Sequence, residues 1–146
     1  MIDTQTLTDE EFDQYLLKAN ADWKTRFSRE SRRIHYDYES DIIQLKFGNP
    51  GFIILHCLDN DPDGFEWVVE DDSLHIVGVE IFYFRWRYVP RYPKLQAAYD
   101  AMCRDWGEGD WFIHLLPQAR TKGASSAAAF ADALLECARD PVAAAD

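Results

Sequence analysis

Cysteine is scarce in this sequence, and uninterrupted apolar runs are short. The three cysteines are an odd number without CxxC spacing, which argues against a disulfide framework and a cysteine-rich zinc site. They are Cys57, Cys103 and Cys137, and each falls in an apolar pattern that predicts a buried thiol. No run approaches the roughly 20 apolar residues that a membrane span requires. Because the first residues also lack the regions of a secretory signal, we expect a cytoplasmic protein without a membrane partner.

Positive charge is scarce as well. The chain has 15 Lys and Arg residues against 26 Asp and Glu, so its net charge is −11. Such a charge opposes binding to nucleic acid and favours a basic protein partner. Hydrophobic residues make up 47% of the 146 positions, which is enough to form a core, since disordered chains lack them. We therefore expect one folded domain, 1–146, in which the tail 141–146 frays.

The motifs of nucleotide binding and of common catalytic sites are missing. The sequence has no P-loop, no GxGxxG and no GxSxG. The histidines lie in predicted strands, with neither HxxxH spacing nor a Cys/His pair at metal-ligand spacing: His35, His56, His75 and His114. His56 and Cys57 are adjacent, but adjacent strand residues point to opposite faces, so they cannot form a nucleophile–base pair. These absences predict a protein that is not an enzyme and holds no metal or cofactor.

Three segments have the periodicity of amphipathic helices. Thr8 and Glu11 form a capping box, and apolar residues then recur at helical spacing from 9 to about 26. A second helix is predicted over 93–106, with Pro93 in its first turn and glycine after its end. A third is predicted over 125–139.

The remaining segments read as strands. Short alternating or apolar runs occur over 34–38, 42–47, 52–58, 65–69, 74–89 and 111–116. The continuous apolar run 52–58 predicts a central strand, and the change of pattern within 74–89 predicts a bulge or bend near Gly78. Consecutive strands joined by short turns indicate an α+β fold. We expect a mainly antiparallel sheet of five to six strands with the three helices packed on one face.

The strongest charge pattern is an acidic block. Residues 59–80 contain eight acids and no Lys or Arg: Asp59, Asp61, Asp63, Glu66, Glu70, Asp71, Asp72 and Glu80. Its first part resembles an EF-hand loop, D-x-[DN]-x-[DN]-G-x5-E, which implies calcium ligands from Asp59 to Glu70. Glu66 stands where that loop is normally apolar, Pro62 lies inside it, and its flanks read as strands. These departures favour an acidic hairpin turn, so we expect no strong calcium site.

A second pattern interleaves cations with aromatic residues: Tyr83, Arg85, Trp86, Arg87 and Tyr88. Trp, Tyr and Arg are the residues most enriched in protein-interface hot spots. The same composition suits stacking on nucleic-acid bases, but the negative charge of the whole protein opposes that use. With Asp59, Asp61, Asp63, Glu66, Glu70, Asp71 and Asp72, these five residues are the predicted partner-binding set.

Three classes of function fit these patterns. The first is a bacterial immunity protein, a non-enzymatic binding protein that neutralises a basic, nuclease-like toxin. The second is a small-ligand-binding protein or enzyme whose pocket lies between sheet and helices, near Trp67, Trp86 and Trp111, with polar groups from His56, Glu70, Glu80 or His114. The third is an adaptor that forms a homodimer or larger homo-oligomer. We favour the first, because acidic surfaces accelerate association with basic partners.

Overall fold

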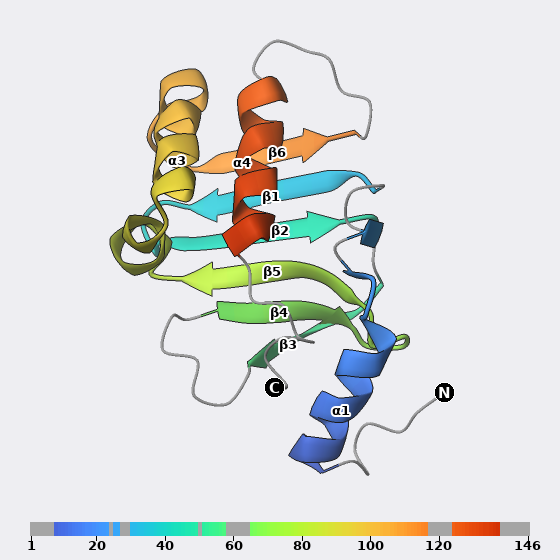
Figure 1. Ribbon diagram of the computed structural model, residues 1–146. Helices are drawn as coiled ribbons and strands as arrows, with labels where there is room; N and C mark the ends of the chain where they lie inside the picture. The colour runs from blue at the N-terminus through green and yellow to red at the C-terminus, as the bar shows by residue number, and fades with distance from the viewer. Residues whose placement is uncertain are drawn as a thin grey trace.

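A computed structural model of the chain describes residues 8–23, 25–26, 30–49, 51–57, 65–116 and 124–137 (Figure 1). The helices are α1 (Asp9–Ala19), α3 (Pro93–Trp106) and α4 (Ala124–Cys137), with a π-helix η2 (Phe84–Tyr88) and a 3-10 turn η3 (Val89–Arg91). The strands are β1 (Arg32–Asp37), β2 (Ile42–Phe47), β3 (Ile53–Cys57), β4 (Phe65–Glu70), β5 (Ile76–Phe82) and β6 (Trp111–Leu115). The tail 141–146 and the first half of the EF-hand-like segment 59–70 lie outside the described residues. No helix within the described ranges is long and apolar enough to cross a membrane.

The strands form one antiparallel sheet in the order β3-β4-β5-β2-β1-β6. In Figure 1, α3 and α4 stand side by side over β6, β1 and β2, and α1 lies near β4 and β3. Leu16 of α1 belongs to the same buried cluster as Leu95 of α3 and Phe130 of α4. The α+β fold predicted from the sequence is therefore confirmed, with six strands.

The face of the sheet beneath the helices carries the core. Ile34, Leu45 and Ile113 are paired across β1, β2 and β6 and all are buried, whereas Arg33 and Phe112 point to the other face and are exposed. This is the period-two alternation expected of strands with one covered face. Aromatic rings fill the space between sheet and helices, with edge or tilted contacts among Tyr36, Phe84, Tyr99, Trp111 and Phe130.

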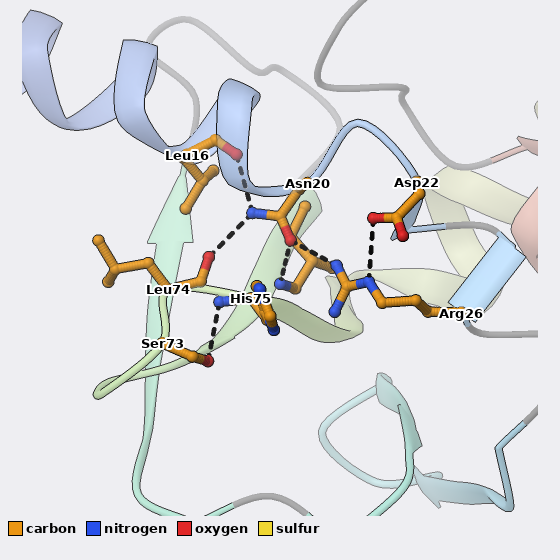
Figure 2. Close-up of polar contacts among 8 residues, drawn as sticks. Leu16, Asn20, Asp22, Arg26, Ser73, Leu74 and His75 are labelled. Carbon is orange, nitrogen blue, oxygen red and sulfur yellow. Dashed lines mark hydrogen bonds and ion pairs between the residues drawn. The ribbon is translucent and has the colours of Figure 1, made fainter.

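Helix α1 begins as predicted but ends early. Thr8 Oγ1 accepts a hydrogen bond from the backbone N–H of Glu11 at 3.1 Å, and the Glu11 carboxylate accepts from Thr8 N at 3.4 Å. The predicted continuous helix to residue 26 is interrupted: α1 stops at Ala19, residues 20–22 form a turn, and residues 23, 25 and 26 are helical again. The residue after Ala19, Asn20, is fully buried, and its side-chain nitrogen donates to the carbonyls of Leu16 and Leu74, both at 2.8 Å (Figure 2). An Asn side chain that bonds backbone groups in this way competes with continuation of the helix.

The segment 52–58 is not the central strand. Residues 53–57 form β3 at the edge of the sheet, and among the described strands it pairs with β4 alone. Leu55 is consequently 48% exposed. The strand that is buried on both faces is β5, whose residues from Ile76 to Ile81 are all buried. The continuous apolar run favoured 52–58, whereas β5 contains Gly78 and the buried Glu80, so apolarity alone pointed to the wrong strand.

Strand β5 contains the irregularity predicted near Gly78. Val68 pairs with Gly78 but Val69 pairs with Ile76, so Val77 is an extra residue that forms a β-bulge. The predicted continuation of this strand to 89 is wrong. The strand ends at Phe82, because Tyr83 has a φ of 54° and turns the chain into the π-helix η2.

We predict that Gly78→Ala destabilises the fold by about 1–3 kcal/mol or more. A Cβ atom at this position would overlap the carbonyl oxygen of Leu45 on the neighbouring strand, and neither backbone can move without breaking the sheet. Gly51→Ala is the matched control, because a Cβ there meets nothing within 4 Å. Urea unfolding measures both, and equal stability of the two variants would contradict the β2–β5 register.

Candidate functional site

The predicted partner-binding residues do not form one surface. Asp59, Asp61 and Asp63 lie outside the described residues. Asp71 and Asp72 are exposed in the β4–β5 turn, while the stretch 83–88 follows the other end of β5. Strand β5 has 7 residues, so about 20 Å separates the two groups at roughly 3.3 Å per residue. The acidic turn and the aromatic residues therefore occupy opposite ends of the sheet (Figure 1).

Two acids of the block have roles inside the fold. The carboxylate of Glu70 accepts hydrogen bonds from Gly51 N at 3.1 Å and Ser73 Oγ at 2.9 Å, and these bonds hold its pKa below the ordinary value. Glu80 is buried and accepts a hydrogen bond from Gln44 Nε2 at 2.7 Å. Glu66 is half-buried opposite Glu80 on the adjacent strand. Of the described block, only Asp71 and Asp72 are openly available to a partner.

The π-helix η2 and its N-cap residue Tyr83 display three of the predicted residues on an exposed surface. Trp86 is 71% exposed and Tyr83 is 53% exposed. The Arg87 guanidinium lies 4.5 Å from the centre of the Tyr83 ring. Arg85 is half-buried and its guanidinium lies 3.9 Å from the centre of the Tyr38 ring and 5.1 Å from that of Trp86. We call Tyr38, Tyr83, Arg85, Trp86 and Arg87 the aromatic surface.

Tyr88 does not belong to this surface. It is buried, and its hydroxyl donates a hydrogen bond to the carbonyl of Cys137 at 3.0 Å. The sequence interpretation placed Tyr88 beside Trp86 because it assumed the two-residue period of a strand. In the π-helix the two side chains point in different directions, so Tyr88 packs inward on Phe84 while Trp86 faces solvent.

Buried Asp41 fixes the start of η2. It has a φ of 59° in the β1–β2 turn and is almost fully buried. Its Oδ1 accepts hydrogen bonds from the backbone N–H of Arg85 at 2.8 Å and the Tyr36 hydroxyl at 2.6 Å. Its Oδ2 accepts from Trp86 N at 3.2 Å, and its carbonyl accepts from Phe84 N at 3.0 Å. Three N–H groups that a helix start leaves without partners are thereby satisfied by one residue.

Asp41 is not among the residues that the sequence patterns marked as functional. Its backbone partners on η2 are more than 40 positions away, so no local motif connects them. An acidic residue in a tight turn is common, and nothing in the sequence marks this one as buried.

Two tyrosines and one cysteine behind the aromatic surface are held in their neutral forms. Burial, and then the hydrogen bond to Asp41, raises the pKa of Tyr36 well above its usual value. Burial also raises the pKa of Tyr99 and of the Cys103 thiol. A thiol with a raised pKa is a poor nucleophile at neutral pH. The cluster can therefore position the surface, and it does not activate a nucleophile.

A rim of carboxylates lies beside Tyr38, at one edge of the aromatic surface. The Tyr38 hydroxyl donates to Glu108 Oε1 and its backbone N–H donates to Asp110 Oδ1, both at 2.8 Å. Asp37 and Glu39 flank Tyr38 in the β1–β2 hairpin. All four acids are exposed. In the described ranges no three His, Cys, Asp or Glu side chains are grouped so as to hold a metal ion.

We expect Asp41→Asn to reduce stability by about 1–3 kcal/mol. Asn tolerates the positive φ, but its amide nitrogen cannot accept hydrogen bonds, so at least one donor on η2 or Tyr36 loses its partner. Amide exchange of residues 84–88 should accelerate. Asp37→Asn is the control, because Asp37 is an exposed residue of the same hairpin. Unchanged exchange in Asp41→Asn would show that the carboxylate does not hold the π-helix.

We also predict that stability falls as pH rises above about 10, the ordinary pKa of tyrosine. The folded-state pKa of Tyr36 is raised, so its contribution is full below the unfolded pKa and is lost progressively above it. Chemical unfolding across the alkaline range measures this loss. Tyr36→Phe should show a smaller decline than the wild type, and an identical decline would contradict the buried, neutral hydroxyl.

Comparison of the chain with protein-family models gives no match. Comparisons with curated proteins and with solved structures give no significant match either. The proposals that follow therefore rest on the geometry of this chain alone.

Proposed function

We propose that this protein is a non-enzymatic binding protein that recognises a basic protein partner through the aromatic surface and its acidic rim. The observation that supports this most is the 71% exposure of Trp86 on a helix that a buried carboxylate holds in place. Burying an exposed Trp in a partner's pocket removes a large apolar area from water. Trp, Tyr and Arg together are typical of interface hot spots.

The surface is pre-organised, which favours tight binding. Arg87 stacks on Tyr83, and Arg85 lies between the rings of Tyr38 and Trp86, so the rings are supported before a partner arrives. The backbone N–H of Trp86 is itself bonded to Asp41. Ordering a side chain at an interface otherwise costs about 0.5–1.5 kcal/mol per residue.

The charge distribution favours a basic partner. The net charge of −11 attracts cations over a distance, and the rim acids Asp37, Glu39, Glu108 and Asp110 lie beside Tyr38 at one edge of the aromatic surface. Lys and Arg of a partner would meet these carboxylates while its apolar pocket receives Trp86. Complementary charge of this kind mainly raises the association rate and selects among partners.

An immunity protein that neutralises a basic, nuclease-like toxin fits this description best. Such a protein needs no catalytic group of its own, and it must bind quickly before the toxin acts. The rim and the net charge supply the attraction, and the aromatic surface supplies the anchor. In the adaptor alternative the same surface would join copies of this chain, and sedimentation at micromolar concentration separates the two.

We predict that Trp86→Ala abolishes protection against such a toxin. The toxin to be tested is any basic domain encoded beside this gene that arrests growth when expressed alone. Co-expression of the wild type should restore growth, and Trp86→Ala should weaken the purified complex by at least about 2 kcal/mol, or roughly 30-fold in Kd. The matched control is Phe112→Ala, since Phe112 is 77% exposed on the far face of the sheet. Equal protection by Trp86→Ala and the wild type would refute the role of this surface.

Charge reversal tests separately whether the rim acids accelerate association with the partner. Glu39→Lys with Asp37→Lys should slow association and reduce its dependence on salt, because these acids border the aromatic surface. Asp71→Lys with Asp72→Lys makes the same change of charge at the opposite end of the sheet. This pair should slow association less than the first pair does. If the second pair slows association more than the first, the partner binds at the acidic turn and not at the aromatic surface.

A further inference from the structure

A cavity of about 170 Å³ lies at the end of the sheet opposite the aromatic surface. Segments far apart in the sequence line it: the region after α1, the residues before β1, the end of β2, and the β4–β5 hairpin. The side chains that matter for its chemistry are Arg26, Glu30, Phe47, Glu70, His75 and Val77. Drug-sized ligands need cavities of roughly 300–1,000 Å³, so this one suits a smaller molecule.

Arg26 is a fixed cation at this cavity. Its Nη2 donates to Asn20 Oδ1 at 2.7 Å and its Nε donates to Asp22 Oδ1 at 3.2 Å (Figure 2). Asn20 is immobile in turn, because it is buried and Oδ1 also accepts from Ile76 N at 2.6 Å. Within the part of the chain that the structure describes, Arg26 Nη1 makes no hydrogen bond or ion pair. A guanidinium oriented in this way, with free N–H groups, is suited to binding a carboxylate.

Carboxylates line the same cavity. The pKa of Glu70 is lowered by the N–H of Gly51 and the hydroxyl of Ser73, so Glu70 is ionised at neutral pH. Each of its oxygens has accepted one hydrogen bond and retains capacity for another. Glu30 has no hydrogen bond or ion pair among the described residues, and its Oε2 lies 3.4 Å from where a Cβ on Gly48 would stand. Two acceptors therefore lie beside one fixed cation.

Apolar side chains complete the cavity. Phe47 and Val77 are both buried residues that reach its wall. A purely anionic ligand would be repelled by Glu30 and Glu70. A purely cationic one would leave the remaining N–H donors of Arg26, which is ion-paired with Asp22 through Nε, without an acceptor. A molecule that carries both charges and a small apolar group satisfies every part of the wall.

We propose that this cavity binds a free α-amino acid with a small apolar side chain. Its carboxylate accepts hydrogen bonds from Arg26, its ammonium donates to Glu30 and Glu70, and its side chain contacts Phe47 and Val77. The site is independent of the proposed partner surface, because the two lie at opposite ends of the sheet.

The test is calorimetric titration of the full chain with L-alanine, L-valine and L-leucine. We expect at least one to bind, and its N-acetyl and amide derivatives to bind at least about tenfold more weakly, since each lacks one of the two charges. Arg26→Gln and Glu30→Gln should each weaken binding to a similar extent. Arg87→Gln, which removes a cation from the aromatic surface, should bind as the wild type does.

Melting temperatures without ligand separate loss of binding from loss of fold. Arg26→Lys retains the charge but not the fork of donors, so it should bind with intermediate affinity. It replaces Arg26→Gln in the test if Arg26→Gln proves unstable. No binding of the three amino acids at millimolar concentration would overturn the proposal. Equal affinity for the blocked derivatives, or unchanged affinity in both Arg26→Gln and Glu30→Gln, would overturn it too.

Discussion

Asp41 accepts hydrogen bonds from two backbone amides of the π-helix and from Tyr36, and its own carbonyl accepts a third amide of the same helix. A π-helix is rare, and it often marks a functional position. Without these bonds the first turn of η2 would expose N–H groups beside an aromatic core, where an unsatisfied donor costs about 1–3 kcal/mol. The direction in which Trp86 points therefore depends on a side chain from the β1–β2 turn. Helix α3 and helix α4 contribute the rings against which Phe84 packs, so the exposed surface is supported from behind by the core.

Asn20 has a role at the other end of the sheet that is equivalent to the role of Asp41. It ends α1, joins the helix to the β4–β5 hairpin and orients Arg26 (Figure 2). Like Asp41, it is a buried polar side chain whose hydrogen-bonding capacity is largely satisfied by backbone groups, as such residues must be. Each end of the sheet thus has one polar residue that determines where functional side chains point.

Local sequence patterns predicted the helices and strands, but contacts between residues far apart in the sequence determine how these elements pack. Features that depend on residues close in sequence could be predicted. They are the Thr8 capping box, the helix over 93–106, and the alternation in β1 and β6. The sequence did not show that β5, and not β3, is the buried inner strand. Strand order depends on pairings that apolarity alone does not encode. The π-helix was read as a strand because its turn depends on Asp41, more than 40 positions earlier. Trp86 and Arg87 were identified by composition, but Tyr88 was wrongly grouped with them. The roles of Asn20 and Arg26 had no local signal at all.

The central claim is that Asp41 acts on partner binding through the position of Trp86. A double-mutant cycle on the affinity of the purified complex tests it most directly, at a temperature at which every variant is folded. Asp41→Asn should weaken the complex although Asp41 is buried and touches no partner. Combined with Trp86→Ala, it should add little further loss, because the side chain that it positions is already absent. Full additivity of the two losses, or an affinity of Asp41→Asn equal to that of the wild type, would contradict the claim.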